Sequence, residues 1–171
     1  MSILKTNQIT DLGGNELLTS NGSGVITGST LSNTPAFYAT QESAQSISSG
    51  SVTVISFDTA SLDTNSCYST STYRFTPNVS GFYCVFMHSA FDSSTDFDGV
   101  EMQMYKNNST QIAGGIVRNE SKDNISLSVI VQLNGSSDNV DARAYQNSGG
   151  AIELRRTGGQ TVFGAYRIIG A

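Results

Sequence analysis

Three carboxylates lie within one short polar stretch of the chain, at Asp92, Asp96 and Asp98. Two serines and a threonine lie between Asp92 and Asp96, and hard cations such as calcium take oxygen ligands of this kind. The spacing lacks the glycine and the closing glutamate of an EF-hand loop. We expect either a calcium site, which is the one cofactor the sequence suggests, or a solvated polar loop.

His88 is the only histidine, so a Ser-His-Asp or Cys-His catalytic arrangement would depend on it alone. It lies in the most apolar run of the chain, 82–91, on the same side as Phe82, Cys84 and Phe86. We expect a packing role for it, in the core or at a subunit axis. The paired glycines match neither the P-loop nor the dinucleotide fingerprint and are typical of turns. The sequence therefore predicts no enzyme and no catalytic residue.

The two cysteines, Cys67 and Cys84, permit either one disulfide or two free thiols. Cys84 sits inside the apolar run, where a buried free thiol is the common outcome. Tetrahedral zinc needs four clustered ligands, so a zinc site is not expected. The oxidation state of the pair stays open at this point.

Three tyrosines fall in or beside expected turns, at Tyr68, Tyr105 and Tyr145. A tyrosine ring offers an apolar body with a polar tip, and binding residues often lie on loops. One hypothesis is that the three form a surface for a host glycan or protein receptor. The other is that they pack at the rim of the fold.

Charge and hydropathy exclude two classes of partner. The net charge is −5 and the sequence has no basic run, so binding to nucleic acid by phosphate neutralisation is not expected. No apolar run approaches the length needed to span a bilayer. Residues 1–7 lack the charged and apolar blocks of a signal peptide. We expect a soluble protein with no membrane partner that does not follow the usual secretory route.

The elements that would hold these residues are predicted to be strands. Only 13% of the residues are charged, while Ser, Thr and Asn are abundant and compete for backbone hydrogen bonds in helices. From residue 35 onward, short runs alternate between apolar and polar positions, most clearly over 125–133. Turn signals separate these runs about every eight to twelve residues, which indicates an all-β sandwich or jelly roll.

The run 82–91 is apolar on both of its faces. A strand of a two-sheet sandwich is buried on both faces only when its outward face meets another subunit. We therefore expect an oligomer, and we assign Tyr83, Val85 and Met87 to the interface between subunits.

Residues 1–34 differ from the rest of the chain. Short apolar pieces alternate with turn signals at 11–14 and 21–24, and the apolar content is too low to build a core. We expect an extended anchor arm whose apolar residues find partners on neighbouring chains or on another protein, followed by a separate domain at 35–171. The alternative for the arm is a flexible leader.

Four segments, taken in order, resemble the C1q-like family. The stretch from Tyr73 to Val85 is similar to the family's Y-x-F-T and G-x-Y-x-F segment, and the other three segments are 35–39, 55–58 and 161–169. The resemblance implies a ten-stranded C1q/TNF-like jelly roll in which three subunits pack around an axis as a homotrimer, with both termini at one end. The chain departs from the family in having no collagen-like stalk.

Residues 3–15 resemble the opening of many phage virion proteins, particularly those of marine phages of cyanobacteria. This resemblance implies a structural protein located in the virion: a tail fibre, a head fibre or a capsid or tail decoration protein. Residues 1–34 would then contact other virion proteins, and the opposite end could attach to the host surface. The alternative is a soluble C1q-like recognition protein that binds a carbohydrate or a protein.

Overall fold

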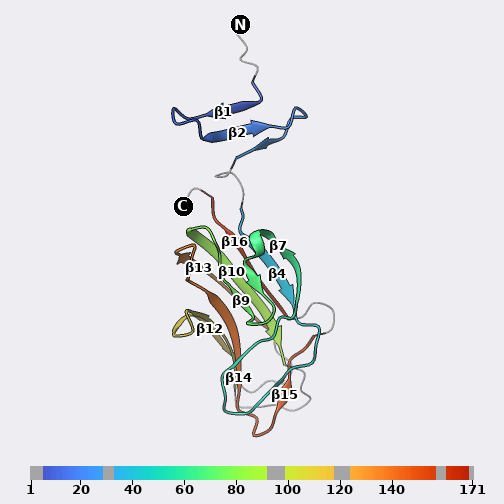
Figure 1. Cartoon of the computed structure of the whole chain (residues 1–171). Coiled ribbons are helices and arrows are strands. Elements are labelled where there is room, and N and C mark those ends of the chain that lie inside the picture. Colours follow the sequence, from blue (N-terminus) through green and yellow to red (C-terminus); the bar gives the residue numbers. More distant parts are fainter. Residues whose placement is uncertain (1–5, 29–32, 92–98, 118–123, 157–160, 170–171) are drawn as a thin grey trace.

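The computed structural model describes residues 6–28, 33–91, 99–117, 124–156 and 161–169. Two large antiparallel sheets face each other and enclose the core (Figure 1). Within the described residues the one helical element is the 3-10 turn η1 (Thr64–Ser66). The predicted all-β jelly roll is confirmed. The described residues contain no helix long and apolar enough to cross a membrane.

The first large sheet has five strands in the order β13-β10-β16-β4-β7. Its bounds are β13 (Asn124–Leu133), β10 (Gly81–Ala90), β16 (Val162–Arg167), β4 (Ala36–Thr40) and β7 (Thr59–Asp63). Strand β10 pairs along its whole length with β13 and over six residues with β16. It therefore lies inside the sheet with both hydrogen-bonding edges occupied.

The second large sheet has six strands. Five of them lie side by side in the order β12-β11-β14-β9-β8, and β6 pairs with β14. Its bounds are β12 (Thr110–Val117), β11 (Val100–Lys106), β14 (Val140–Gln146), β9 (Arg74–Phe75), β8 (Tyr68–Ser69) and β6 (Thr53–Val54). A small sheet pairs β15 (Ile152–Glu153) with β5 (Ser46–Ile47). The described residues from β4 onward thus contain thirteen strands instead of the expected ten, and five of the thirteen are only two residues long.

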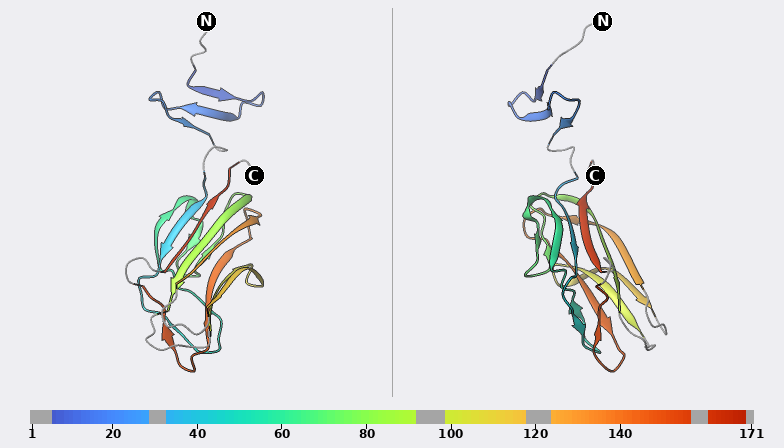
Figure 2. Two further views of the ribbon diagram at one scale, coloured as in Figure 1. Left: turned by 180° about the vertical axis from the view of Figure 1, so that it is seen from behind. Right: turned by 90° about the vertical axis from the view of Figure 1, so that its right-hand side faces the viewer.

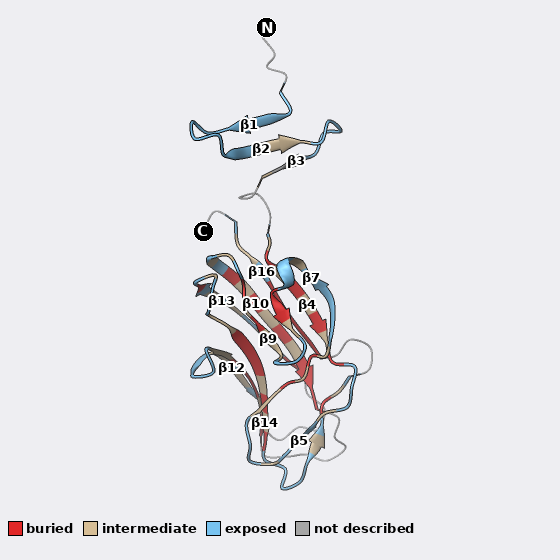
Figure 3. Ribbon diagram, viewed as in Figure 1, coloured by how far each residue is buried: buried red, intermediate tan, exposed pale blue. Residues whose placement is uncertain are grey.

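The buried residues lie on strands of both large sheets (Figure 3). Aromatic rings fill the space between the two sheets. The Phe37 ring stacks on Tyr68 and Phe75, with ring centres 4.5 and 4.8 Å apart, and meets Phe163 edge-on at 5.0 Å. Phe75 in turn contacts Tyr83 edge-on at 5.4 Å. Offset and edge-on geometries are the favourable ones for aromatic pairs. Because these rings come from both sheets, they fasten one sheet to the other.

The turn between β13 and β14 depends on Gly135, whose φ is +73°. A Cβ at this position would lie 2.2 Å from the backbone nitrogen of Ser80, so the two turns touch through backbone atoms. The Asn134 side chain accepts the backbone N–H groups of Ser136, Ser137 and Asp138 and closes the turn. Only glycine satisfies both the conformation and the close approach.

The N-terminal arm forms its own small sheet of β1 (Gln8–Thr10), β2 (Glu16–Ser20) and β3 (Ile26–Thr27). Figure 2 shows it standing apart from the sandwich, beyond the end where β4 begins and β16 finishes. The Asp11 carboxylate accepts the backbone N–H groups of Gly13 and Asn15 and shapes the first turn. Asn21 does the same for Ser23 and Val25 in the second turn.

Candidate functional site

The inward side of β10 belongs to the core of the single chain. Tyr83, Val85 and Met87 are fully buried beneath the second sheet, and the Tyr83 hydroxyl donates to the Val79 carbonyl at 2.5 Å. Burial raises the pKa of Tyr83 to about 12. The assignment of Tyr83, Val85 and Met87 to a subunit interface was therefore wrong, because the chain's own sheet already covers them.

The outward side of β10 carries Phe82, Cys84, Phe86 and His88, each exposed or half-exposed. The register places neighbours from β13, β16, β4 and β7 beside them, and most of these neighbours are apolar. We call this surface the apolar face and define it as Tyr38, Leu62, Phe82, Cys84, Phe86, His88, Ser126, Ser128, Ile130, Gln132, Val162, Gly164 and Tyr166.

Cys84 lies at the middle of the apolar face, between Ile130 on one neighbouring strand and Tyr166 on the other. The Ile130 side chain is 64% exposed and that of Tyr166 is 42% exposed. The side-chain hydrogen bond with Cys84 raises the pKa of Tyr166. Soluble monomers rarely expose contiguous apolar surfaces of this kind, so such a surface indicates a contact site.

Gly164 makes a socket in the apolar face for the ring of Phe86. A Cβ on Gly164 would lie 2.4 Å from Phe86 Cζ, so the ring rests directly over the β16 backbone. The Tyr38 ring lies on the other side of Gly164 in register, and its centre is 6.4 Å from that of Phe86. The absence of a side chain at Gly164 thus lowers the Phe86 ring into the sheet and flattens the face.

The structure gives both cysteines as free thiols. Cys67 is buried next to η1, where its Sγ lies 3.3 Å from an Asp63 carboxylate oxygen. Burial and this carboxylate raise the pKa of Cys67 to about 12. Cys84 is half-exposed on the apolar face. The two thiols therefore differ sharply in accessibility.

His88 lies on the side predicted for it, together with Phe82, Cys84 and Phe86, and it is half-exposed. Its Nδ1 is hydrogen-bonded to Ser126 Oγ at 2.7 Å. In the described part of the chain no acidic side chain is bonded to this pair, and no cluster of three potential metal ligands occurs. Asp92, Asp96 and Asp98 lie outside the described residues, and a calcium site there stays a prediction.

A second surface lies on the outward side of the six-stranded sheet, where a buried carboxylate joins two arginines. Arg143 bonds Asp141 through two nitrogens, at 2.6 and 3.2 Å, and Arg74 Nε lies 3.5 Å from the same carboxylate. The guanidinium of Arg143 also lies over the Tyr105 ring, 4.1 Å from its centre. We call Arg74, Glu101, Gln103, Tyr105, Asp141, Arg143 and Tyr145 the charged face.

The three tyrosines proposed as one receptor surface do not lie together. Tyr68 is buried, stacks on Phe37 and donates its hydroxyl to the Phe57 carbonyl at 2.9 Å, so its assignment to a surface was wrong. Tyr105 and Tyr145 are both half-exposed on the charged face, on adjacent strands. The alternation of Asp141, Arg143 and Tyr145 along one strand was the sequence signal for this face.

Comparison with known protein families identifies the family of this chain. The family model for the C1q domain matches residues 36–166, which is most of the sequence. The chain belongs to the C1q domain family. No curated protein sequence matches it significantly.

Solved structures show the same fold at low sequence identity. Murine APRIL at pH 5.0 matches with a TM-score of 0.61 and 11% identity, over 78% of this chain and 98% of that one. The Eiger TNF of S. frugiperda matches with a TM-score of 0.58 and 11% identity, over 80% and 93% of the two chains. The C1q/TNF jelly roll inferred from the four ordered segments is thus confirmed.

Proposed function

We propose that this C1q-domain chain forms a homotrimer through the apolar face. The observation that carries the proposal is the exposure of Ile130 and Tyr166 on either side of Cys84, with Phe82 and Phe86 on the same strand. Covering apolar surface is worth about 25 cal/mol for each Å² removed from water. C1q and TNF domains assemble as trimers, and a shared sheet face of this kind supplies the contact that such an assembly needs.

The mass of the protein in solution tests the trimer. Multi-angle light scattering on the whole chain should give about 54 kDa, three times the 18.1 kDa of one chain. A single species near 18 kDa at micromolar concentration would refute the assembly, since an exposed face of this size would then stay in water.

The role proposed for the trimer is that of a structural virion protein of a bacteriophage, as a tail fibre, head fibre or decoration protein. Two features support this role. Residues 3–15 resemble the openings of phage virion proteins, and the arm stands beyond one end of the sandwich. The proposal divides the chain into an arm at 1–34, which contacts other virion proteins, and a domain at 35–171, whose far end faces outward toward the host.

Antibody labelling of particles tests the virion role. Gold-labelled antibodies against the recombinant trimer should decorate purified phage particles at one kind of position in electron micrographs. The genes on either side should encode tail, capsid or fibre proteins. A chain that is absent from purified particles and abundant in the surrounding fluid would overturn the virion role.

A second candidate is a soluble recognition protein, which the charged face favours. Arg143 over Tyr105 offers a planar cation and an aromatic ring, and both groups bind sugars and proteins well. Arg143 is held by Asp141 and so presents a fixed geometry. Binding of the trimer to a glycan array, lost in Tyr145→Ala and kept in Leu12→Ala, whose leucine is fully exposed in the arm, would support this candidate. Equal binding by both variants would refute it.

A further inference from the structure

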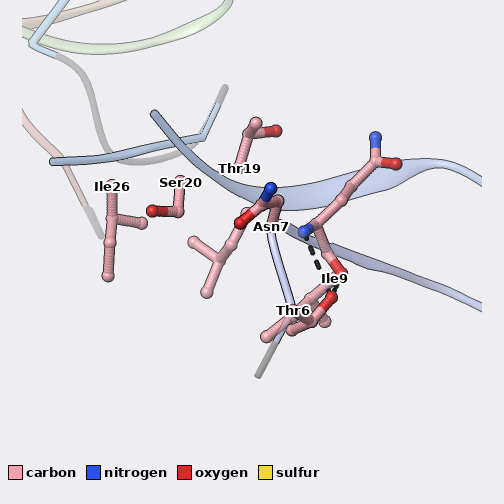
Figure 4. Close-up of a pocket in the computed structure, with 8 residues that line it drawn as sticks. Thr6, Asn7, Ile9, Thr19, Ser20 and Ile26 are labelled. Atoms are coloured by element: carbon pink, nitrogen blue, oxygen red, sulfur yellow. Dashed lines mark hydrogen bonds between the residues drawn. The ribbon is translucent and has the colours of Figure 1, made fainter. Parts of the chain in front are cut away.

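The sheet of the arm has two faces of opposite character. Ile9 pairs with Leu18, and Ile26 pairs with Ser20, two residues beyond Leu18 on the same strand. Cross-strand partners and alternate residues share a face, so Ile9, Leu18 and Ile26 lie on one side. Figure 4 shows Ile26 projecting away from the side that carries Thr19. We call Ile9, Leu18, Ser20 and Ile26 the arm's apolar side.

On the opposite side of the arm, the Glu16 carboxylate is hydrogen-bonded within the sheet itself. Glu16 accepts a hydrogen bond from Gln8 Nε2 at 3.1 Å and another from the Thr19 hydroxyl. A register shift at Ile9/Thr10 is what turns Glu16 toward these two residues. Gln8, Glu16 and Thr19 therefore point away from the arm's apolar side.

None of the described residues covers the apolar side. Ile9 is 43% exposed and Ile26 is 60% exposed, and these residues border a hollow of about 90 Å³. Three strands of two to five residues need a packed face for independent stability. The sheet thus requires a cover that the described part of one chain does not provide.

We propose that two further copies of this chain provide the cover, so that three arms pack their apolar sides together into a short β-stalk on the axis of the trimer. The proposal rests on the homotrimer proposed above. β4 follows the arm and belongs to the sheet that carries the apolar face, so a trimer brings three arms to the same end. The eight residues 28–35 between β3 and β4 reach at most about 28 Å, which keeps the arms close.

Local concentration and charge favour copies of the chain over any other occupant. Arms tethered by such a short connection meet one another at an effective concentration in the millimolar range. The apolar side contains no charged residue, so three identical copies approach one another without repulsion. The shape of the stalk follows from the threefold axis, with Glu16 of each arm on the outside.

The experiment compares Leu18→Asp with Leu12→Asp, the same substitution at a leucine in the first turn of the arm. Leu12 is fully exposed, so it is the matched control. Hydrogen–deuterium exchange should show arm amides protected about 100-fold in the native chain and in Leu12→Asp, and unprotected in Leu18→Asp. Light scattering should give a trimer for all three proteins.

A second variant separates contact between chains from contact within one chain. Ile130→Asp alters the apolar face of the sandwich and leaves the arm sequence untouched. In the monomer it is expected to give, the arm amides should lose their protection. Protection that persists in that monomer overturns the stalk, because one chain would then suffice.

Three other results would also overturn either the stalk or the homotrimer. A native trimer with unprotected arm amides overturns the stalk and assigns the apolar side to another protein. Equal protection in Leu12→Asp and Leu18→Asp overturns it as well. A native chain that is monomeric overturns the proposed homotrimer itself, and light scattering distinguishes this failure from the others.

Discussion

Replacing Ile130 by aspartate should convert the trimer into a folded monomer. Ile130 is 64% exposed in the single chain and lies beside Cys84 on the apolar face. Folding of one subunit therefore depends little on it, while the trimer buries what the subunit leaves open. The same substitution at Val85, which is fully buried, should instead prevent folding.

The free-energy effects of Ile130→Asp follow from how much of Ile130 is buried in the subunit and in the trimer. Full burial of an isoleucine is worth about 1.5–3 kcal/mol, so the third of Ile130 that the subunit covers contributes about 1 kcal/mol or less to folding. The exposed remainder is worth about 1–2 kcal/mol in the interface, and a desolvated carboxylate without a partner costs about 3–5 kcal/mol more. Three such sites weaken the trimer by about 12 kcal/mol or more, and every 1.4 kcal/mol is a tenfold change in the association constant.

Light scattering and thermal unfolding together measure the effect. Ile130→Asp should elute as one 18 kDa species with the β-sheet circular dichroism of the native chain. Val52→Asp is the matched control, because Val52 is 48% exposed on the side of the other sheet. It should remain a trimer. A stable trimer from Ile130→Asp, or a monomer from Val52→Asp, would show that the interface lies elsewhere on the sandwich.

Four further outcomes are expected. Gly135→Ala should lower the free energy of unfolding by about 2–4 kcal/mol in denaturant titrations, because it combines a positive φ with a backbone clash. In the native trimer neither cysteine should react quickly with a thiol reagent at pH 8. After the trimer dissociates, the Cys84 thiol should become accessible to the reagent, while Cys67 stays buried and unreactive. Hydrogen bonds from Asn107, then Lys106, lower the pKa of Asp138 below its ordinary value. Its stabilisation is therefore present above about pH 4 and disappears as the pH falls, and Asp138→Asn should flatten that acid dependence of the melting temperature. A chelator should lower the melting temperature by removing calcium from the site predicted at Asp92, Asp96 and Asp98, and an unchanged value contradicts that site.

The sequence predicted the strand at Gly81–Ala90 but not which of its faces the subunit covers. Strict alternation identifies a core face because the other face is polar. This strand is apolar on both faces, so its periodicity carries no information on direction. The pattern therefore did not determine whether the face with Tyr83, Val85 and Met87 or the opposite face lies at a subunit interface. Only the register with β16 and β13, together with the second sheet above, distinguishes the two faces.

The burial of Tyr68 could not be predicted from the sequence for a different reason. Its neighbours in sequence are turn residues, and residues near turns are usually exposed. In the structure, however, the η1 turn precedes a two-residue strand whose Tyr68 side chain points inward onto Phe37. The contact joins residues 31 positions apart, and a local pattern does not contain it.

The charged face could be predicted in part. The alternation of Val140, Ala142 and Ala144 with polar residues gives the outward side of β14 directly. The burial of Asp141 does not follow from that alternation, since Arg74 reaches it from β9, far away in sequence. Burying a carboxylate requires charge partners around it, and here they come from two strands.

The arrangement of the chain ends makes the domain a scaffold for presenting foreign peptides. β4 begins and β16 finishes at the end nearest the arm, so a peptide fused to either terminus would be directed toward the stalk (Figure 1). The turn after β14 lies at the other end, and Gly149 and Gly150 have open space around them. An insertion there would leave both large sheets unbroken. In the proposed trimer, one gene would then present three copies of the inserted epitope on the same tip, which suits multivalent capture of a repetitive target.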